Sequence, residues 1–368
     1  MKKLRLPFTL GLLFLLFMCA CPALAQQNNN PLRIAVAGVA HGHLNDVTSR
    51  IKRGDFKIVG VYEKDDRMRE QNGLSRLVDK KLFYGNLEQM LDETKPEAVV
   101  AYGSIRDHLS VVEACAPRGI HVMVEKPLAM NIKHAKQMAK LAQKYHILLL
   151  TNYETSWYDT NHEAYKIIKD GGIGQITRIQ VYDGHQGPFE IGCGKDFTDW
   201  LTDPEQNGGG AIIDFGCYGA NLATWILNGQ RPVSVYATAN QQKPGKYPKV
   251  EDDATIIVQY PNLTVQLMPS WNWPMNRKDM YVYGEKGYIY QQTGKKMFIQ
   301  QNGTYIPVSP EPLKAPYNDS FYYLKAAVRG EIEVKPYDLA SLENNLIVVE
   351  ILDAAIKSAK RGKVVYLK

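Results

Sequence analysis

The sequence predicts an α/β protein of two domains, in which a parallel sheet covered by helices on both faces precedes a domain of α+β character. Two patterns support this prediction. From Arg33 to Leu150, short apolar runs alternate with helical stretches, which is typical of a parallel sheet between helices. After about Gly174 the apolar runs flank turn residues, which indicates hairpins and an antiparallel or mixed sheet. A chain of 368 residues is long enough for two buried cores.

The first domain is expected over residues 32–151. Apolar residues from Ile132 to Ala142 recur at helical spacing, and Asn131 is placed to cap the first turn of that helix. The five expected strands are short apolar runs, the pattern of strands that are buried on both faces. These runs are residues 34–37, 57–62, 98–101, 121–124 and 147–150.

The second domain is expected over residues 152–368. Asn302-Gly303 lies between two short strands and is a strong hairpin signal. Pro261-Asn262 and Gly284-Glu285-Lys286-Gly287 separate two further pairs of strands, and the chain ends in two helical patterns. The expected strands are residues 176–182, 255–260, 263–267, 280–283, 288–290, 298–301 and 305–308, and the expected helices lie near 321–329 and 339–360.

Composition and charge exclude several classes of protein. The chain is 45% hydrophobic and 22% charged, as in ordinary globular domains rather than disordered or fibrous chains. The formal net charge is +6, and Lys2, Lys3 and Arg5 supply three of these charges. Since no run of Lys and Arg would form a basic stripe, no nucleic-acid partner is expected.

The N-terminus is predicted to be a signal peptide over residues 1–25. A positive start is followed by an apolar stretch from Leu10 to Ala20 and then by Ala23-Leu24-Ala25, a small-residue cleavage site. The apolar stretch is shorter than the ~20 residues that a spanning helix needs, so we expect cleavage after Ala25 and no stable membrane span. A lipoprotein anchored at Cys21 is disfavoured by the residues before it. In a bacterium the mature protein would be periplasmic and would begin with a short linker over residues 26–31.

Five cysteines are present, of which Cys19 and Cys21 lie in the predicted leader. Cys115, Cys193 and Cys217 remain. An odd number without close spacing argues against a disulfide framework and against a zinc site. We therefore expect these cysteines to act as small buried hydrophobic side chains.

A nucleotide-binding turn is predicted where the first strand gives way to a helix. Gly38-Val39-Ala40-His41-Gly42-His43 stands at this point, where a parallel sheet presents backbone amides and a positive helix end to a pyrophosphate. Glu63 ends the second strand, and its carboxylate can accept both ribose hydroxyls and repel a 2′-phosphate. We therefore expect NAD, with NADP disfavoured, although Ala40 and His43 replace glycines of the usual fingerprint.

His41 and His43 alternate in this turn and could also be read as metal ligands. Because no Asp, Glu or Cys partner stands at a recognisable spacing, no metal is expected, and polar contacts to phosphate are the favoured interpretation. Gly38, Ala40 and Gly42 complete the predicted cofactor set at this turn.

A catalytic constellation is predicted from two separate segments. Glu125-Lys126-Pro127 follows the fourth strand directly, where a charged pair faces the ligand crevice of a parallel sheet. Gly208-Gly209-Gly210 opens an expected amphipathic helix on which the i, i+4 spacing of Asp214 and Tyr218 places both on one face. An acid and a phenol above a lysine can transfer protons. Taken alone, the segments could instead be a salt-bridged surface turn and a helix start with a buried tyrosine.

These motifs together resemble the glucose–fructose oxidoreductase, inositol dehydrogenase and rhizopine-catabolism family, often written Gfo/Idh/MocA. Glu-Lys-Pro and the triple-glycine helix at this separation form a specific signal, and the matching pieces run almost end to end. The other matching pieces are the turn at Gly38, His108, residues 119–122, 250–254 and 284–287, and the closing pattern to Val365.

The resemblance implies a doubly wound Rossmann domain and a second domain with an open, mostly antiparallel mixed sheet. It implies hydride exchange between NAD and a hydroxyl-bearing carbon of a sugar or polyol. Lys126 would orient that hydroxyl and lower its pKa, and Asp214 would help to position the substrate. Tyr218 stands where many members have histidine, and we expect the neighbouring ammonium to lower its pKa towards the working range. Lys126 and Tyr218 are therefore the expected proton-transfer pair.

Further cofactor contacts are expected near the ends of the third and fourth strands. The chain departs from the family pattern there, because Gly103-Ser104-Ile105 replaces a common Thr-Pro-Asn stretch and residues 152–156 lack a common arginine. The additional cofactor residues are Gly103, Ser104, His108, Glu125 and Lys126.

Trp157, His185 and Trp200 lie in segments expected to line the crevice between the domains. Aromatic faces suit sugar rings, so these residues are the predicted substrate contacts for a small carbohydrate. An open sheet face commonly becomes buried between subunits, so a homodimer or homotetramer is expected.

Export leaves three functional hypotheses open, because free NAD is scarce outside the cytoplasm. The first is an oxidoreductase whose tightly held NAD is regenerated by a second sugar or ketone. The second is a glycosidase in which transient oxidation permits elimination of the aglycone and addition of water, before reduction restores the sugar. The third is a sugar-binding protein without catalysis, against which the intact Lys126, Asp214 and Tyr218 argue.

Overall fold

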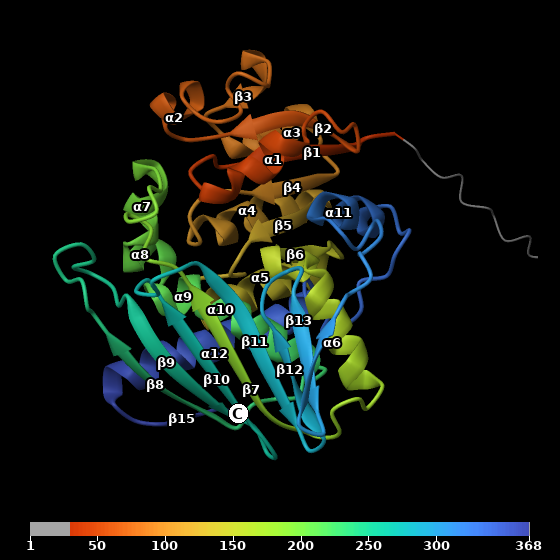
Figure 1. The fold of residues 1–368 in the computed structure, drawn as a ribbon. Helices are drawn as coiled ribbons and strands as arrows, with labels where there is room; N and C mark the ends of the chain where they lie inside the picture. The colour runs from red at the N-terminus through yellow and green to blue at the C-terminus, as the bar shows by residue number, and fades with distance from the viewer. Residues whose placement is uncertain (1–29, 368) are drawn as a thin grey trace, which may run out of the picture. The chain divides into compact units, whose positions relative to one another are not determined.

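The computed structural model describes residues 30–367, which form two sheets with their covering helices (Figure 1). The predicted signal peptide lies outside the described residues, and so does most of the predicted linker. No helix among the described residues has both the length and the apolar character that crossing a bilayer requires.

The first sheet is parallel throughout and has the strand order β3-β2-β1-β4-β5-β6, as the alternating pattern predicted. Continuous apolar runs such as Ala98–Ala101 are buried along their whole length, because helices cover both faces of the sheet. The strands are β1 (Leu32–Ala37), β2 (Phe56–Tyr62), β3 (Phe83–Tyr84), β4 (Ala98–Ala101), β5 (His121–Glu125) and β6 (Leu149–Asn152).

Three helices of this sheet, α2, α3 and α5, begin at a residue whose side chain caps the first turn. The side chain of Asn131 accepts from the backbone N–H of His134 and so starts α5, as predicted. The same helix ends at His146 in the left-handed conformation, and β6 begins at Leu149 rather than Ile147 because Ile147 still bonds to the last helical turn. The helices are α1 (Asn45–Arg50), α2 (Asp66–Glu70), α3 (Leu87–Thr94), α4 (Asp107–Cys115) and α5 (Ile132–Tyr145), with 3-10 turns at Gly42–Leu44, Lys80–Leu82 and Ala116–Arg118.

The second sheet is mixed and has the order β14-β13-β12-β11-β7-β10-β9-β8-β15, in which only β7 and β10 are parallel. Asn302 and Gly303 both have positive φ in the predicted hairpin turn. The sequence did not reveal β8, because its small and polar residues alternate with only two buried ones. The strands are β7 (Ile176–Gly184), β8 (Ser234–Asn240), β9 (Asp253–Gln259), β10 (Thr264–Ser270), β11 (Arg277–Gly284), β12 (Gly287–Gln291), β13 (Met297–Gln301), β14 (Thr304–Val308) and β15 (Val365–Tyr366).

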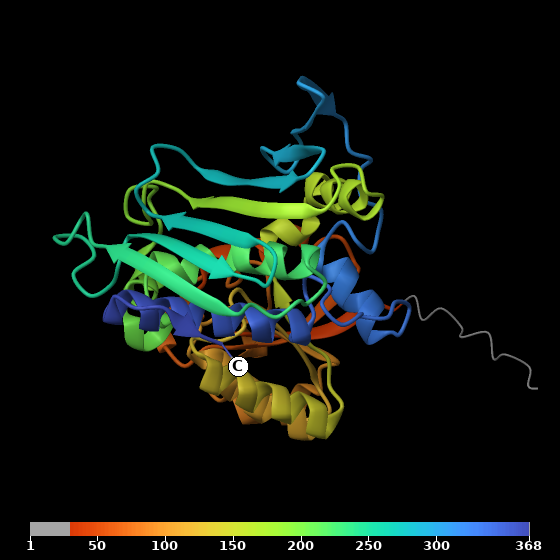
Figure 2. The same ribbon diagram turned by 90° about the horizontal axis from the view of Figure 1, so that it is seen from below.

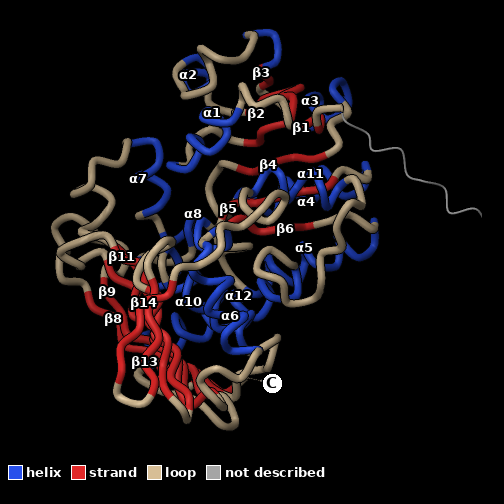
Figure 3. The backbone as a smooth tube through the Cα atoms, turned by 45° about the vertical axis from the view of Figure 1, so that its right-hand side comes forward, coloured by secondary structure: helices blue, strands red, loops and turns tan. Residues whose placement is uncertain are grey.

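Helices cover one face of the second sheet, as Figure 3 shows for α6, α10 and α12. The opposite face carries a row of aromatic rings, in which Tyr281 stacks on Tyr290 with centroids 4.2 Å apart and Phe298 stacks on Tyr305 at 4.6 Å. The helices of this part are α6 (Asp159–Lys169), α7 (Lys195–Leu201), α8 (Pro204–Asn207), α9 (Ala211–Asp214), α10 (Gly216–Ile226), α11 (Ser320–Val328) and α12 (Leu342–Arg361), with a 3-10 turn at Glu154–Trp157.

The last two helices return to the first sheet and tie both halves together. Figure 2 shows α12 (blue) between the second sheet and the helices of the first. Phe321 of α11 stacks on Phe56 of β2 at 4.7 Å, and Val349 of α12 packs into the apolar core beneath the first sheet. Arg50 and Arg53 both bind Asp319, which caps α11. Residues after 152 therefore contribute to the core around the first sheet.

Candidate active site

The predicted nucleotide turn leaves β1 at Gly38, where only glycine fits. Gly38 has φ +83°, and a Cβ at this position would lie 2.5 Å from the backbone nitrogen of Gly103. The turn from β1 is thereby held against the turn that follows β4. The backbone N–H of Ala40, two residues after Gly38, has no acceptor among residues 30–367, so it can donate to a phosphate.

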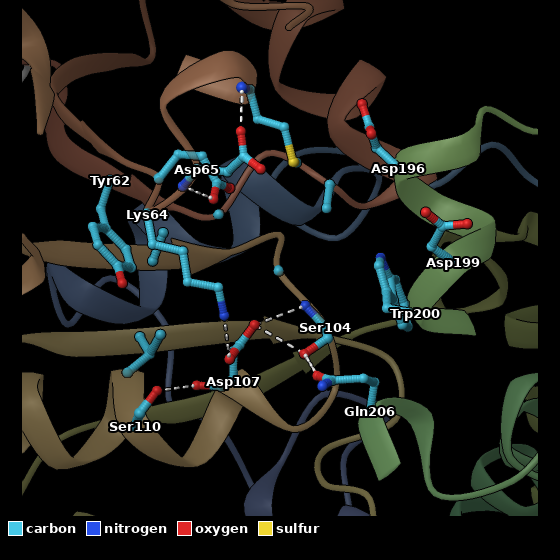
Figure 4. A pocket seen from close by; sticks show the side chains of 17 residues that line it. Tyr62, Lys64, Asp65, Ser104, Asp107, Ser110, Asp196, Asp199, Trp200 and Gln206 are labelled. Carbon is cyan, nitrogen blue, oxygen red and sulfur yellow. Dashed lines mark hydrogen bonds and ion pairs between the residues drawn. The ribbon is translucent and has the colours of Figure 1, made fainter. Parts of the chain in front are cut away.

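A cavity of about 330 Å³ opens beside this turn (Figure 4). Five of the predicted cofactor residues line it: Gly38, Ala40, Glu63, Gly103 and Ser104. Several further polar side chains of its walls had no recognisable signal in the sequence, because they come from the loop after Glu63 and from α4, α7 and α8. These are Lys64, Asp65, Asp107, Asp196, Asp199 and Gln206.

Glu63 lies at the end of β2 as predicted, and its carboxylate is anchored by the backbone. Oε2 accepts from Val39 N at 3.1 Å and Oε1 accepts from Asp65 N at 3.0 Å. Each carboxylate oxygen can accept more than one hydrogen bond, so the two oxygens can still receive ribose hydroxyls. The anchoring fixes the side chain between the turn after β1 and the turn after β2.

The cavity is strongly acidic, which matches NAD better than NADP. Glu63 and four aspartates line it, whereas Lys64 is its one cationic side chain among the described residues. That lysine lies 3.7 Å from Asp107 and is paired there. A 2′-phosphate on the ribose would meet this carboxylate cluster without a free cation to bind it.

The helices α7 and α8 form the wall opposite β2, as Figure 4 shows for Asp196, Asp199, Trp200 and Gln206. Arg67 of α2 binds Asp196 at 2.6 Å, and Gln206 accepts from the Ser104 hydroxyl at 3.2 Å. Trp200, a predicted substrate contact, therefore lines this cavity beside the Gly38 turn. It does not line the cavity around Lys126 that is described below.

The three histidines of the predicted cofactor set lie away from that cavity. His41 is buried against Trp200 and Phe197, and burial holds its pKa well below the usual range. His108 is buried in α4, where its Nδ1 bonds to the Leu128 carbonyl at 3.1 Å and burial lowers its pKa. His43 turns towards the catalytic motif. Its Nδ1 lies 2.8 Å from Oε2 of Glu125.

Glu125 is buried, and each of its carboxylate oxygens has a protein partner. His43 bonds to one oxygen, and Asn152 Nδ2 donates to the other at 2.7 Å. Burial by itself would raise the pKa of Glu125, but His43 and the hydrogen bonds from His43 and Asn152 lower it to about 2. Trp157, another predicted substrate contact, donates its Nε1 to Asn152 at 3.1 Å and lines a separate cavity beside α6 and α11.

Lys126 and Asp214 form a buried ion pair between the two halves of the chain. Lys126 Nζ donates to Asp214 Oδ1 at 2.5 Å and to the Asp214 carbonyl at 3.1 Å, while Trp271 Nε1 donates to Oδ2 at 2.9 Å. Burial alone would lower the pKa of Lys126, but the Asp214 carboxylate raises it overall. For Asp214 the directions are reversed: burial alone would raise its pKa, but Lys126 lowers it overall. Both groups are therefore charged at neutral pH.

The triple-glycine segment leads into the short helix α9, which ends at Asp214, and not into one long helix. A Cβ on Gly210 would lie 1.9 Å from the Glu251 carbonyl, so only glycine fits there. Glu251 Oε1 accepts from Gly210 N and Ile212 N and so caps α9. The helix then breaks at Phe215, and α10 is buried along its whole length. The expected single amphipathic helix is therefore wrong, because this segment packs on all sides.

Tyr218 lies beside the ammonium groups, but its pKa moves opposite to the predicted direction. Lys126 Nζ lies 5.2 Å and Lys278 Nζ 4.6 Å from the centre of its ring. Burial raises the pKa of the phenol well above its usual range, and the nearby carboxylates of Glu154 and Asp214 raise it further. Tyr218 is therefore a protonated phenol at neutral pH.

A second cavity of about 210 Å³ surrounds the ion pair. It brings together Lys126, Asp214, Tyr218, His43 and His185, which the sequence analysis had singled out in separate segments. His185 Nδ1 accepts from Gly187 N at 2.9 Å, so a neutral ring carries its proton on Nε2. Burial lowers the pKa of His185 and favours that neutral form. Cys193, Phe197, Asn276 and Lys278 also line this cavity and were not predicted.

Lys278 had no signal in the sequence. It lies at the start of β11, far along the chain from Glu125-Lys126-Pro127, and only the pairing of β11 with β7 brings it to Tyr218. Its ammonium group is paired with Glu154. Of the cysteines, Cys115 and Cys217 are buried as predicted, whereas Cys193 is only partly covered.

The fold also brings the Glu125 carboxylate close to His41 and His43 of the turn after β1. Candidate ligand atoms of His41, His43 and Glu125 all lie within 4.8 Å of one another. Hydrogen bonds already link these side chains, since His41 Nδ1 accepts from His43 N and His43 Nδ1 bonds to Glu125.

Comparison with known proteins agrees with this geometry. A family model described as "Oxidoreductase family, NAD-binding Rossmann fold" matches residues 32–153, and one described as "GFO/IDH/MocA C-terminal domain" matches residues 161–290. The chain belongs to the Gfo/Idh/MocA family. It is an NAD-binding oxidoreductase of that family, as the resemblance of its motifs implied.

The family relatives are distant in sequence and close in fold. The trans-1,2-dihydrobenzene-1,2-diol dehydrogenase of Xenopus laevis is 23% identical over 317 residues, which cover 82% of this chain and 90% of that protein. An inositol dehydrogenase homolog from Azotobacter vinelandii, solved with NAD+, superposes with a TM-score of 0.79 at 17% identity and covers 92% of this chain and 98% of its own. The aldose-aldose oxidoreductase of Caulobacter crescentus, solved with glycerol, gives a TM-score of 0.78 at 21% identity over 92% of this chain and all of its own.

Proposed function

We propose that this oxidoreductase oxidises a hydroxyl-bearing carbon of a sugar or polyol at the cavity around Lys126. The single observation that supports this most is the ammonium of Lys126, which is charged, buried and fixed by Asp214 in a cavity next to the cofactor turn. Bound NAD supplies the hydride acceptor. Two relatives named above, an inositol dehydrogenase homolog and an aldose-aldose oxidoreductase, support a polyhydroxylated substrate.

Lys126 acts on the substrate hydroxyl as a fixed hydrogen-bond donor. Asp214 receives one N–H of the ammonium through its side chain and another through its carbonyl, so a third N–H can point at the substrate. A positive group in a dry cavity stabilises the negative charge that develops on the hydroxyl oxygen as its proton leaves. Asp214 acts through Lys126, whose ammonium group it holds in place, and is thus a positioning residue.

The proton of the substrate hydroxyl needs an acceptor other than Tyr218. Because the phenol is protonated, Tyr218 can donate a hydrogen bond to a sugar oxygen but cannot readily take a proton. His43 is better placed to accept. A carboxylate only accepts, so His43 Nδ1 donates to Glu125, and Nε2 of a neutral ring is then the acceptor in the cavity shared with Lys126.

Replacing Lys126 with alanine tests the proposed function. We expect kcat/KM to fall about 10²–10³-fold, as for loss of a donor to a developing oxyanion. The measurement is the absorbance of reduced nicotinamide after addition of a panel of sugars and polyols. Turnover close to wild type would contradict the assignment.

Lys126→Ala also leaves Asp214 buried without its partner, which should destabilise the fold by about 3–5 kcal/mol. The double variant Lys126→Ala with Asp214→Asn removes both charges and serves as the control. Its melting temperature should recover towards wild type while its activity stays low. The alternative of a redox-neutral glycosidase predicts a different result. A chromogenic aglycone would be released, and the absorbance of reduced nicotinamide would show no lasting change.

His43→Ala tests the proposed proton acceptor. We expect turnover to fall about 10²-fold or more with NAD content unchanged, because general-base catalysis is lost. Added imidazole should restore part of the turnover, which a merely structural role would not permit. His134→Ala, a histidine of α5 outside the cavity, is the matched control. Turnover within twofold of wild type in His43→Ala would rule out this role.

We also propose that the protein is exported and keeps its NAD tightly bound. The positive start, the short apolar stretch and the small residues before Gln26 support cleavage after Ala25. N-terminal sequencing of the mature protein from the periplasmic fraction should begin at Gln26, and the purified protein should contain NAD in near-equal amount. A cytoplasmic protein that retains Met1 would contradict this proposal.

The aromatic face of the second sheet is the surface that we propose for self-association. Tyr281, Tyr290, Phe298 and Tyr305 form a row across β11 to β14, and no helix among residues 30–367 covers that side. Apolar and aromatic rows of this size are commonly buried between subunits. Sedimentation velocity should therefore show a dimer or tetramer, and Tyr305→Glu, in the same row, should shift it towards monomer.

A further inference from the structure

The catalytic cavity does not end at Lys278. A further cavity of about 270 Å³ lies next to it, and Asn276 and Lys278 line both. Its other walls come from the start of α6, from β11 and β12, and from the loop after β12: Tyr158, Arg277, Asp279, Tyr290, Gln292 and Thr293. Lys278 therefore stands between the two spaces, with its ammonium group 4.6 Å from the Tyr218 ring.

Strand pairing explains why this space exists. The last pair between β11 and β12 joins Met280 to Gln291, so Arg277 to Asp279 extend beyond the end of β12. On their other side these three residues pair with β7, which keeps them in place. The gap beside them is open because the chain turns away from the sheet at Gln292.

The walls of this outer cavity, which is lined by Tyr158, Arg277 and Tyr290, are rigid and rich in hydrogen-bonding groups. Arg277 donates two hydrogen bonds to the buried Asp279, at 2.7 and 2.8 Å. Its guanidinium lies 4.2 Å from the Tyr182 ring centre and 4.5 Å from that of Trp273. Tyr290 is stacked on Tyr281 at 4.2 Å. Fixed aromatic and polar walls bind a hydroxylated ring with little loss of side-chain freedom.

Size also indicates a ligand that reaches both spaces. The cavity around Lys126 holds about 210 Å³, which is below the roughly 300–1,000 Å³ that small-molecule sites usually offer. With the adjoining 270 Å³ the combined space lies within that range. A single sugar unit over Lys126 would leave the outer cavity empty, whereas a second unit would fill it.

We infer that the cavity lined by Tyr158, Arg277 and Tyr290 is a subsite for the group attached to the sugar that is oxidised. The substrate class is therefore glycosides, with a disaccharide as the simplest member, rather than free monosaccharides or cyclic polyols. This inference rests on the proposed function, because it places the oxidised unit at Lys126. Lys278 and Asn276, at the junction, are positioned to bind the oxygens between the two units.

The test compares single sugars with two-unit ligands in both binding and turnover. Glucose, methyl glucoside, cellobiose, maltose and lactose are titrated calorimetrically into the NAD-loaded protein, and the same ligands are assayed by nicotinamide absorbance. We expect at least one disaccharide to bind about tenfold or more tighter than glucose and to have a correspondingly higher kcat/KM.

Two variants localise the effect to the outer cavity. Tyr290→Ala should weaken binding of the preferred disaccharide about tenfold and leave glucose unchanged. Tyr288→Ala, on the same strand and the same face but outside the cavity, should change neither. Gln292→Trp fills the cavity from its exposed rim and should have the same selective effect without removing a ring from the sheet.

The outcomes separate this inference from the proposed function. Turnover of glucose and disaccharides with equal kcat/KM, unaffected by Gln292→Trp, would overturn the subsite and leave the oxidoreductase assignment standing. Selective binding of disaccharides without any change in nicotinamide absorbance or release of the attached group would support the subsite and overturn the proposed chemistry. Absence of binding by every sugar would overturn both.

Discussion

The buried ion pair between Lys126 and Asp214 is the interaction on which the site depends. Removing two charges from water is costly, and the pair is tolerated only when hydrogen bonds complete both groups. Lys126 comes from the end of β5 in the first sheet, and Asp214 comes from α9 beside the second. Trp271 and the Glu251 cap of α9 fix the carboxylate. The two halves of the chain must therefore meet in one arrangement before the lysine can take the role that we propose for it.

A second contact joins the cofactor turn to the catalytic strand. His43 stands where the nucleotide fingerprint has glycine, and its side chain binds Glu125 next to Lys126. A glycine could not make this bond, so the departure from the fingerprint is explained by the chemistry of the neighbouring motif. Glu125 in turn binds Asn152 of β6. The 3-10 turn after β1 and the ends of β5 and β6 are thereby joined through one buried carboxylate.

Much of this architecture was predictable from local patterns. Apolar runs between helical stretches determined the parallel sheet, because strands that are buried on both faces must be apolar throughout. Asn131 and Asn302-Gly303 act within a few residues, so their cap and turn followed directly from the sequence. Gly38 and Glu63 were found for the same reason, since each stands at the end of a strand. The family motifs likewise identified Lys126, Asp214 and Tyr218.

Only the tertiary structure decided how these residues work together. The pKa of Tyr218 depends on burial by surrounding elements, which no spacing along the chain reveals. Lys278 reaches the site through strand pairing, and the carboxylates opposite Glu63 come from α7, so neither had a local signal. Trp157 and Trp200 lie in other cavities because the path of the loops, rather than residue type, sets where a side chain points. The sequence by itself determined the fold class, the turn after β1 and the lysine that we propose as catalytic. Long-range packing determined the protonation of Tyr218, the approach of Lys278 to the site and the outer cavity lined by Tyr290.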